Sequence, residues 1–175
     1  MTGEMMDFRD FKELMRDLSK YIITIIVILF LLIYVFSLQQ IVGPSMNKTL
    51  QDQDVMILLK SHYRLFPVER NDIIAFKYED TKYLVKRVIG LPGENIEYKD
   101  NKLYINGEIV EDKYATGATG DFKINYDKIP ENKFLVLGDN REDSVDSREI
   151  GLIDKDDIIG KVKIRIWPIN KIRVF

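Results

Sequence analysis

The sequence predicts a mainly β protein, a compact antiparallel sheet or barrel, behind one N-terminal transmembrane helix. Residues 21–38 contain no Asp, Glu, Lys or Arg. Beyond them, short apolar or alternating runs recur between turn dipeptides, as in antiparallel β proteins. With 175 residues, of which 46% are hydrophobic, the chain has the length and apolar content of one ordinary domain.

Composition excludes several classes of site. The chain has no cysteine, which rules out disulfides, thiolate zinc sites, iron–sulfur clusters and a cysteine nucleophile. Its single histidine, His62, excludes a multi-histidine metal site and receives no role here. A net charge of −2 argues against nucleic acid as a partner. We therefore expect no metal, no cofactor and no nucleic-acid partner.

Residues 21–38 are predicted to form a retained signal-anchor. As a helix they would span roughly 27 Å, about the thickness of the hydrocarbon core of a bilayer. A buried core helix is unlikely to be this free of charge in so small a chain. A cleaved signal peptide would need small residues before its cleavage site, and residues 37–42 (SLQQIV) offer no such pair.

Flanking charge predicts the orientation of this anchor. Four basic residues precede it, whereas only Lys48 is basic among residues 39–59. The four are Arg9, Lys12, Arg16 and Lys20. Basic residues favour the cytoplasmic side. We therefore expect a single-pass protein of the cell membrane, with residues 1–20 cytoplasmic and residues 39–175 forming an extracytoplasmic β-rich domain.

Eight runs in the outer domain are predicted as strands: residues 55–59, 72–78, 83–89, 95–98, 102–105, 108–110, 133–137 and 158–166. Turn signals separate them, among them Asn106-Gly107, a hairpin dipeptide. Residues 115–120 (ATGATG) have small side chains and are predicted to be a flexible loop. No helical pattern longer than about ten residues follows residue 40.

Two motifs carry candidate catalytic groups. Ser45 follows Gly43-Pro44 on a constrained turn, and at full extension it lies at most about 23 Å beyond Leu38. Lys86 lies in the 83–89 run, where alternation places it with Leu84 and Val88. A lysine on an apolar face has a lowered pKa, which suits a general base, although a solvent-facing lysine is the simpler interpretation.

The third motif, residues 138–151, is rich in carboxylates. An EF-hand calcium loop starting at Asp139 would need Gly at its sixth position and Glu at its twelfth, where this chain has Ser144 and Ile150. Asp146 and Arg148 are instead spaced to form a charge-assisted bracket around a site.

Together, these three motifs resemble the boxes of the bacterial type I signal peptidases, membrane-bound Ser-Lys proteases. The boxes are residues 45–50 (SMNKTL), 86–94 (KRVIGLPGE) and 138–148 (GDNREDSVDSR). The resemblance implies a serine endopeptidase that removes signal peptides from secreted preproteins, after small residues at P1 and P3 of the Ala-x-Ala type. Its implied partners are such preproteins and the lipid bilayer, and a monomer is favoured.

By this resemblance, Ser45 is the nucleophile and Lys86 the general base. Supporting roles follow for five further residues: Ser144 would hold the lysine amine, Asp146 and Arg148 would brace the site, and Asp139 and Arg87 would form a structural pair. An apolar wall is expected to form the shallow substrate pockets from Ile41, Met46, Leu50, Leu84 and Val85.

The chain departs from the family pattern at two positions. Lys48 replaces the usual proline, so the turn after Ser45 is expected to lose one rigid φ. Gly43 stands where some members carry a serine that helps to stabilise the oxyanion. The backbone N–H of Ser45 is then the donor that can be named, and a second donor is unidentified.

Other readings remain open. Ser45 and Lys48 form an S-x-x-K motif as in penicillin-binding proteins, but no K-T-G follows. Self-cleaving repressors use a similar Ser-Lys domain, but they cut an Ala-Gly bond that this chain lacks. An inactive anchored binding domain is the non-enzyme alternative. Trp167 ends an apolar run, and core packing is favoured for it over contact with lipid.

Overall fold

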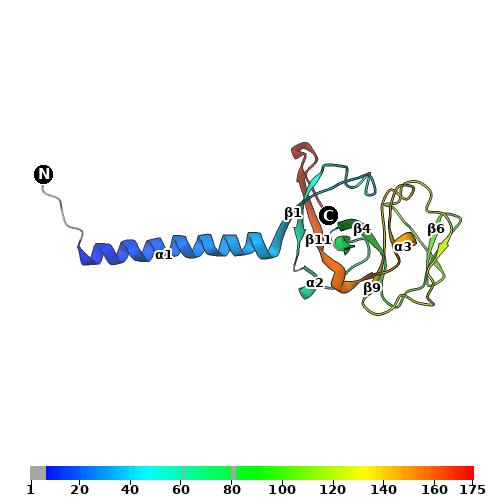
Figure 1. Ribbon diagram of the computed structural model, residues 1–175, viewed down its shortest axis with the longest axis horizontal. Helices are drawn as coiled ribbons and strands as arrows, with labels where there is room; N and C mark the ends of the chain where they lie inside the picture. Colours follow the sequence, from blue (N-terminus) through cyan, green and yellow to red (C-terminus); the bar gives the residue numbers. More distant parts are fainter. Residues whose placement is uncertain (1–6, 61, 80–81) are drawn as a thin grey trace. The chain divides into compact units, whose positions relative to one another are not determined.

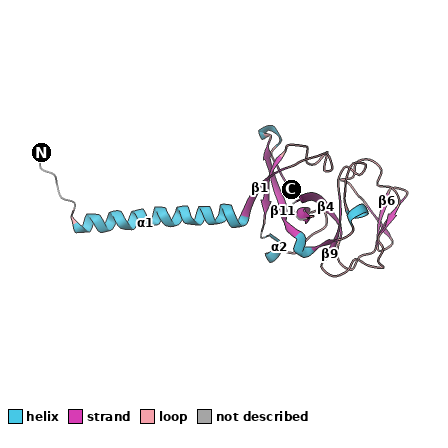
Figure 2. Cartoon of the chain, in the orientation of Figure 1, coloured by secondary structure: helices cyan, strands magenta, loops and turns pink. Residues whose placement is uncertain are grey.

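The structure is a computed structural model that describes residues 7–60, 62–79 and 82–175, so the first six residues of the expected cytoplasmic segment lie outside it. The chain divides into two units, Met1–Phe36 and Ser37–Phe175. The first contains α1 (Phe8–Phe30), which continues as the π-helical η1 (Leu31–Val35) (Figures 1 and 2). By length and apolar composition, this helical stretch could cross a membrane.

The helix differs in extent from the apolar segment predicted at residues 21–38. It begins at Phe8, because Phe8, Phe11 and Leu18 recur at helical spacing among charged residues and extend the apolar stripe toward the N-terminus. It ends at Val35, and residues 36–38 instead belong to β1 (Phe36–Gln40). A short apolar run fits either a helix or a strand, so hydropathy alone does not fix this boundary.

The second unit is built on an eight-stranded sheet. The strand order is β1-β2-β11-β3-β4-β9-β10, so β11 (Ile158–Trp167) lies between β2 (Val55–Leu59) and β3 (Ile73–Tyr78). From β2 to β10, neighbouring strands pair antiparallel. The remaining strands are β4 (Lys82–Gly90), β9 (Lys133–Leu137), β10 (Ile153–Asp154) and β12 (Arg173–Val174), which pairs with β11. The predicted mainly β, antiparallel fold is confirmed.

A second, smaller sheet has the order β7-β6-β5-β8. Its strands are β5 (Ile96–Lys99), β6 (Lys102–Ile105), β7 (Glu108–Val110) and β8 (Phe122–Lys123). Asn106 and Gly107 turn the β6–β7 hairpin with φ of 54° and 86°, the left-handed pair that a two-residue hairpin turn requires. The hairpin dipeptide therefore acts as the sequence predicts.

Helices of the second unit are short. They are α2 (His62–Leu65), α3 (Ser147–Ile150), η2 (Lys155–Asp157) and η3 (Ile169–Lys171). Trp167, at the end of β11, has 54% of its surface exposed, so the favoured expectation of core packing is wrong. It lies next to η3, where Ile169 and Ile172 are also exposed.

Strand alternation divides the core around β9. Leu135 and Leu137 pack with Ile96 and Tyr98 of the small sheet, whereas Phe134 and Val136 belong to a cluster on the large sheet. A third cluster joins the segment 41–50 to the large sheet through residues that include Ile41, Met46, Leu50, Met56, Leu58 and Val162. The segment that carries Ser45 is therefore fixed by apolar packing.

Replacing Gly90 with alanine is predicted to destabilise the protein. A Cβ at this position would lie 2.5 Å from Ile129 Cδ1, 2.9 Å from Ile96 Cγ1 and 3.0 Å from Leu135 Cβ, all in the core beside the small sheet. Overpacking of this kind costs about 1–3 kcal/mol. Thermal unfolding of the full chain in detergent should show a lower melting temperature for Gly90→Ala. An unchanged temperature would contradict the tight packing described here.

Candidate active site

Ser45 and Lys86 meet although forty residues separate them along the chain. Lys86 Nζ lies 2.6 Å from Ser45 Oγ, within hydrogen-bond distance. Lys86 comes from β4 and pairs in register with Ile74 of β3, and only 2% of its surface is exposed. Ser45 lies on a turn closed by the bond from Asn47 N–H to the carbonyl of Pro44.

Burial controls the charge of Lys86. Burial, together with the Arg148 guanidinium, lowers the pKa of the amine to about 8. The carboxylates of Asp146 and Asp139 act in the opposite direction and raise it. Among the described residues, no carboxylate forms an ion pair with Lys86, because Asp139 and Asp146 are each bound by an arginine. A pKa near 8 gives the amine that touches Ser45 a far larger neutral fraction near neutral pH than an exposed lysine has.

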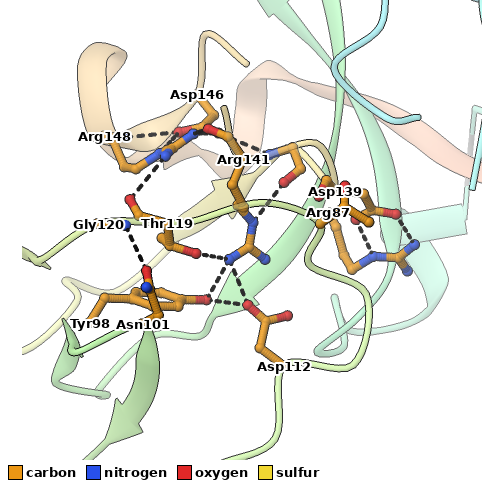
Figure 3. Close-up of polar contacts among 12 residues, drawn as sticks. Arg87, Tyr98, Asn101, Asp112, Thr119, Gly120, Asp139, Arg141, Asp146 and Arg148 are labelled. Carbon is orange, nitrogen blue, oxygen red and sulfur yellow. Dashed lines mark hydrogen bonds and ion pairs between the residues drawn. The ribbon is translucent and has the colours of Figure 1, made fainter. Parts of the chain in front are cut away.

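Asp139 and Arg87 form a buried, two-bond ion pair. Arg87 Nε and Nη2 lie 2.8 and 2.7 Å from the two carboxylate oxygens, as Figure 3 shows. Thr49 Oγ1 also donates to Asp139, and the N–H of Asn140 donates to the carbonyl of Ser45 at 3.0 Å. The pair therefore ties three segments together: β4, the turn of Ser45 and the loop after β9.

Asp146 and Arg148 form the second pair. Arg148 Nε and Nη2 each lie 2.9 Å from an oxygen of Asp146, which also accepts the N–H of Gly138 at 3.0 Å. Burial opposes ionisation, but the hydrogen bonds from Arg148 and Gly138 hold the pKa of the Asp146 carboxyl below its ordinary value. The loop 138–148 is thereby closed on itself.

Ser144 does not make its expected contact. Its hydroxyl oxygen is buried and has no hydrogen-bond partner among the residues that the structure describes, so the bond to the Lys86 amine is not formed. The hydroxyl instead faces Gly138, where an added Cβ would overlap it and would also lie 2.6 Å from the carbonyl oxygen of Ser45. Glycine at 138 thus permits the close approach of this loop to the turn of Ser45.

A groove of about 490 Å³ opens beside the two side chains. Four of the five predicted wall residues line it: Ile41, Met46, Leu84 and Val85. Leu50 does not, because its side chain is fully buried in the core beneath. Sequence reasoning missed other lining residues, including Met56, Leu58, Ala75, Tyr83 and Ile159. Of these, Ala75 could have been identified from strand pairing, because it lies opposite the predicted wall residue Val85 across β3 and β4.

Lys48 lies away from the site chemistry. Its side chain is exposed. Its φ is 84°, which proline cannot adopt, so a proline at this position would require a different conformation of the turn. The lysine that contacts Ser45 is Lys86, which contradicts the S-x-x-K alternative. The N–H of Gly43 donates to Asp52 at 2.8 Å and is already occupied.

Over the described residues, no cluster of three or more His, Cys, Asp or Glu side chains could hold a metal ion. The functional groups brought together are a hydroxyl, an amine of low pKa and two arginine–carboxylate brackets. Such a set can support nucleophilic attack by a serine that an amine deprotonates.

Comparison with known proteins identifies the family. The family model described as signal peptidase, peptidase S26, matches residues 14–167. Signal peptidase IB of Staphylococcus aureus strain Mu50 is 35% identical over 179 aligned residues, covering 90% of this chain and 94% of the relative. Signal peptidase I of Bacillus caldolyticus is 37% identical over 164 residues, covering 86% and 90%.

A solved structure supports the same family assignment. The crystal structure of a signal peptidase I from Enterococcus faecalis V583 matches with a TM-score of 0.50 and 34% identity, covering 55% of this chain and 97% of that chain. From the family match, the two relatives and this fold, the chain belongs to the bacterial type I signal peptidases, serine endopeptidases of peptidase family S26.

Proposed function

We propose that this chain removes N-terminal signal peptides by Ser-Lys acyl-enzyme chemistry. The neutral Lys86 amine takes the proton of Ser45 Oγ as this oxygen attacks the scissile carbonyl. The resulting ammonium then protonates the leaving amine. Water, deprotonated by the same lysine, hydrolyses the acyl-enzyme and releases the signal peptide. One observation carries the proposal: Lys86 Nζ lies 2.6 Å from Ser45 Oγ.

A backbone N–H at the start of the turn would stabilise the developing oxyanion. The N–H of Ser45 is the donor we assign, because it donates to no acceptor among the described residues. Arg87 with Asp139, and Arg148 with Asp146, would hold the two segments on either side of the dyad. The bond between Ser144 and the amine that the resemblance implies would require Ser144 to leave the position described above.

Substrate would bind as an added strand. From Lys82 to Arg87, β4 pairs with β3 on one side, whereas it pairs with β9 only from Arg87 onward. Residues 83–86 therefore present an edge that no described strand covers, beside the groove. Ile41, Met46, Leu84 and Val85 would leave shallow apolar room for small P1 and P3 side chains.

The apolar helix would anchor the enzyme in the cell membrane. The basic residues before it favour a cytoplasmic N-terminus, which would leave the β unit, close to the predicted residues 39–175, outside the cytoplasm. Exposed Trp167, Ile169 and Ile172 would then contact the lipid interface. A monomer suffices for this chemistry, since both dyad residues come from one chain.

Paired variants test the dyad. Ser45→Ala and Lys86→Met are each expected to abolish cleavage of a preprotein that has an Ala-x-Ala site, because they remove the nucleophile and the base without adding bulk. The measurement is product formation by the full chain in detergent. Lys48→Asn, whose side chain tolerates a left-handed φ, is the matched control and should retain activity. Loss of activity in Lys48→Asn alone would refute the assignment of the base.

Activity is expected to rise with pH through about 8. Only the neutral amine can accept a proton, and below its pKa the neutral fraction of Lys86 falls about tenfold for each pH unit. The profile of kcat/KM, measured on a peptide without ionisable side chains near its scissile bond, should show this limb. Lys48→Asn should leave its midpoint in place. A profile that is flat between pH 6 and 9 would contradict a Lys86 base.

Trp167, the only tryptophan of the chain, reports on lipid contact. In vesicles of brominated phosphatidylcholine, the full chain should show strong quenching of tryptophan fluorescence, because the exposed indole would lie at the interface. Iodide in the aqueous phase should quench it weakly. The opposite ranking of the two quenchers would place Trp167 in water and remove the interfacial role.

A further inference from the structure

The segment between β7 and β8 is bonded to the loop that frames the dyad. We call residues 111–120 the strap. The N–H of Thr116 donates to the carbonyl of Asp139 at 2.7 Å, and the carbonyl of Thr116 accepts the N–H of Arg141 at 2.9 Å. Ala118 N–H donates to Glu142 Oε1 at 3.2 Å. Residues 115–120, predicted to be a flexible loop, are thus held by several hydrogen bonds.

Arg141 joins this loop to the small sheet. Its side chain is fully buried, and Nε donates to the carbonyl of Gly138 at 2.8 Å. Nη1 reaches three oxygens at the other end: Tyr98 Oη at 3.0 Å, Thr119 Oγ1 at 2.8 Å and Asp112 Oδ2 at 2.6 Å. Figure 3 shows the guanidinium between these groups, with the two arginine–carboxylate pairs of the site on either side.

The strap also touches both of those pairs. Arg148, which binds Asp146, donates through Nη1 to the carbonyl of Thr119 at 3.2 Å and through Nη2 to the carbonyl of Arg141 at 2.7 Å. The Arg87 guanidinium, which binds Asp139, lies 3.6 Å from the centre of the Tyr114 ring. Each bracket around the dyad is therefore completed by a residue of the strap.

We propose that the small sheet, acting through Tyr98, the strap and Arg141, positions the loop 138–148 around the Ser45–Lys86 dyad. This inference rests on the proposed function. Arg141 and Tyr98 form hydrogen bonds with other residues and with neither Ser45 nor Lys86, so they are positioning residues. Their effect passes through Gly138, whose N–H holds Asp146 and whose carbonyl accepts from Arg141.

A loosened loop should change how Lys86 titrates. The charged groups that act on its amine are Asp146, Asp139 and Arg148, and Ser45 contacts it directly. All three charged groups are fixed by contacts with the strap or with the loop it holds. Opening the loop would admit water to the amine, and the hydrated ammonium would be favoured. The pH limb of activity should then move upward.

The experiment compares Tyr98→Phe, Arg141→Lys and Arg141→Ala in the full chain. Tyr98→Phe removes only the hydroxyl shared by Asp112 and Arg141. Its matched control is Tyr104→Phe on β6 of the same sheet, whose hydroxyl takes no part in the Arg141 network. For each variant, kcat, KM and the midpoint of the pH limb are measured well below the melting temperature, which is determined separately.

For Arg141→Ala we expect kcat to fall by about tenfold or more at unchanged KM, and the pH midpoint to rise. Tyr98→Phe should change both quantities in the same direction by less, Arg141→Lys should restore part of the loss, and Tyr104→Phe should match wild type. A lower melting temperature with unaltered kcat and pH midpoint in Tyr98→Phe and Arg141→Ala would overturn the inference, leaving these residues a purely structural role. A wild type without the Lys86 limb would instead refute the proposed function.

Discussion

The proposed active site depends on an amine that is buried against a hydroxyl and forms no ion pair with a carboxylate of the described residues. A lysine in such a place would ordinarily recruit an acidic partner and stay charged. Here, Asp139 and Asp146 lie near enough to influence Lys86, yet each is held by two hydrogen bonds from an arginine. The arginines thus satisfy the carboxylates that would otherwise keep the amine protonated, and burial then favours its neutral form.

One strand, β4, serves several parts of this arrangement. Its first half has an uncovered edge beside the groove, its centre carries Lys86, and the next residue, Arg87, anchors the turn of Ser45 through Asp139 and Thr49. Beyond Arg87, the strand pairs with β9, from which the loop 138–148 departs. The groove, the proposed base and the supporting loop are therefore placed by consecutive parts of a single strand, and this limits how far they can move apart.

Local patterns predicted much of the fold. The long strands and the Asn106-Gly107 hairpin follow from alternation and turn chemistry, and both operate over a few residues. Strands of two residues, such as β8 and β10, are defined by their partners and leave no pattern of their own. The segment 115–120, interpreted from its sequence as a flexible loop, is misjudged for the same reason. Its small residues suggest flexibility, but its bonds are to a loop more than twenty residues away.

The candidate site, like the fold, is only partly predictable from local sequence patterns. Family motifs named the residues that the structure brings together, yet they could not show that Leu50 faces the core or that Trp167 is exposed. Nor could they show that the Ser144 hydroxyl has no hydrogen-bond partner among the described residues. Each of these depends on how whole segments pack. Arg141, which belongs to the third motif, received no role because its partners Tyr98 and Asp112 lie in a different sheet and its connecting segment.

The position of β11 bears on how the proposed dyad is brought together. This strand separates β2, which follows the segment of Ser45, from β3, which leads into the strand of Lys86. It also follows Ser45, Lys86 and the loop 138–148 along the chain. A nascent chain that ends before Ile158 carries every residue of the dyad and its brackets but lacks the central strand that joins the two halves of the sheet. Without β11, no described strand of the large sheet connects β2 to β3, so this late strand is what joins the halves of the sheet that lead from Ser45 and to Lys86.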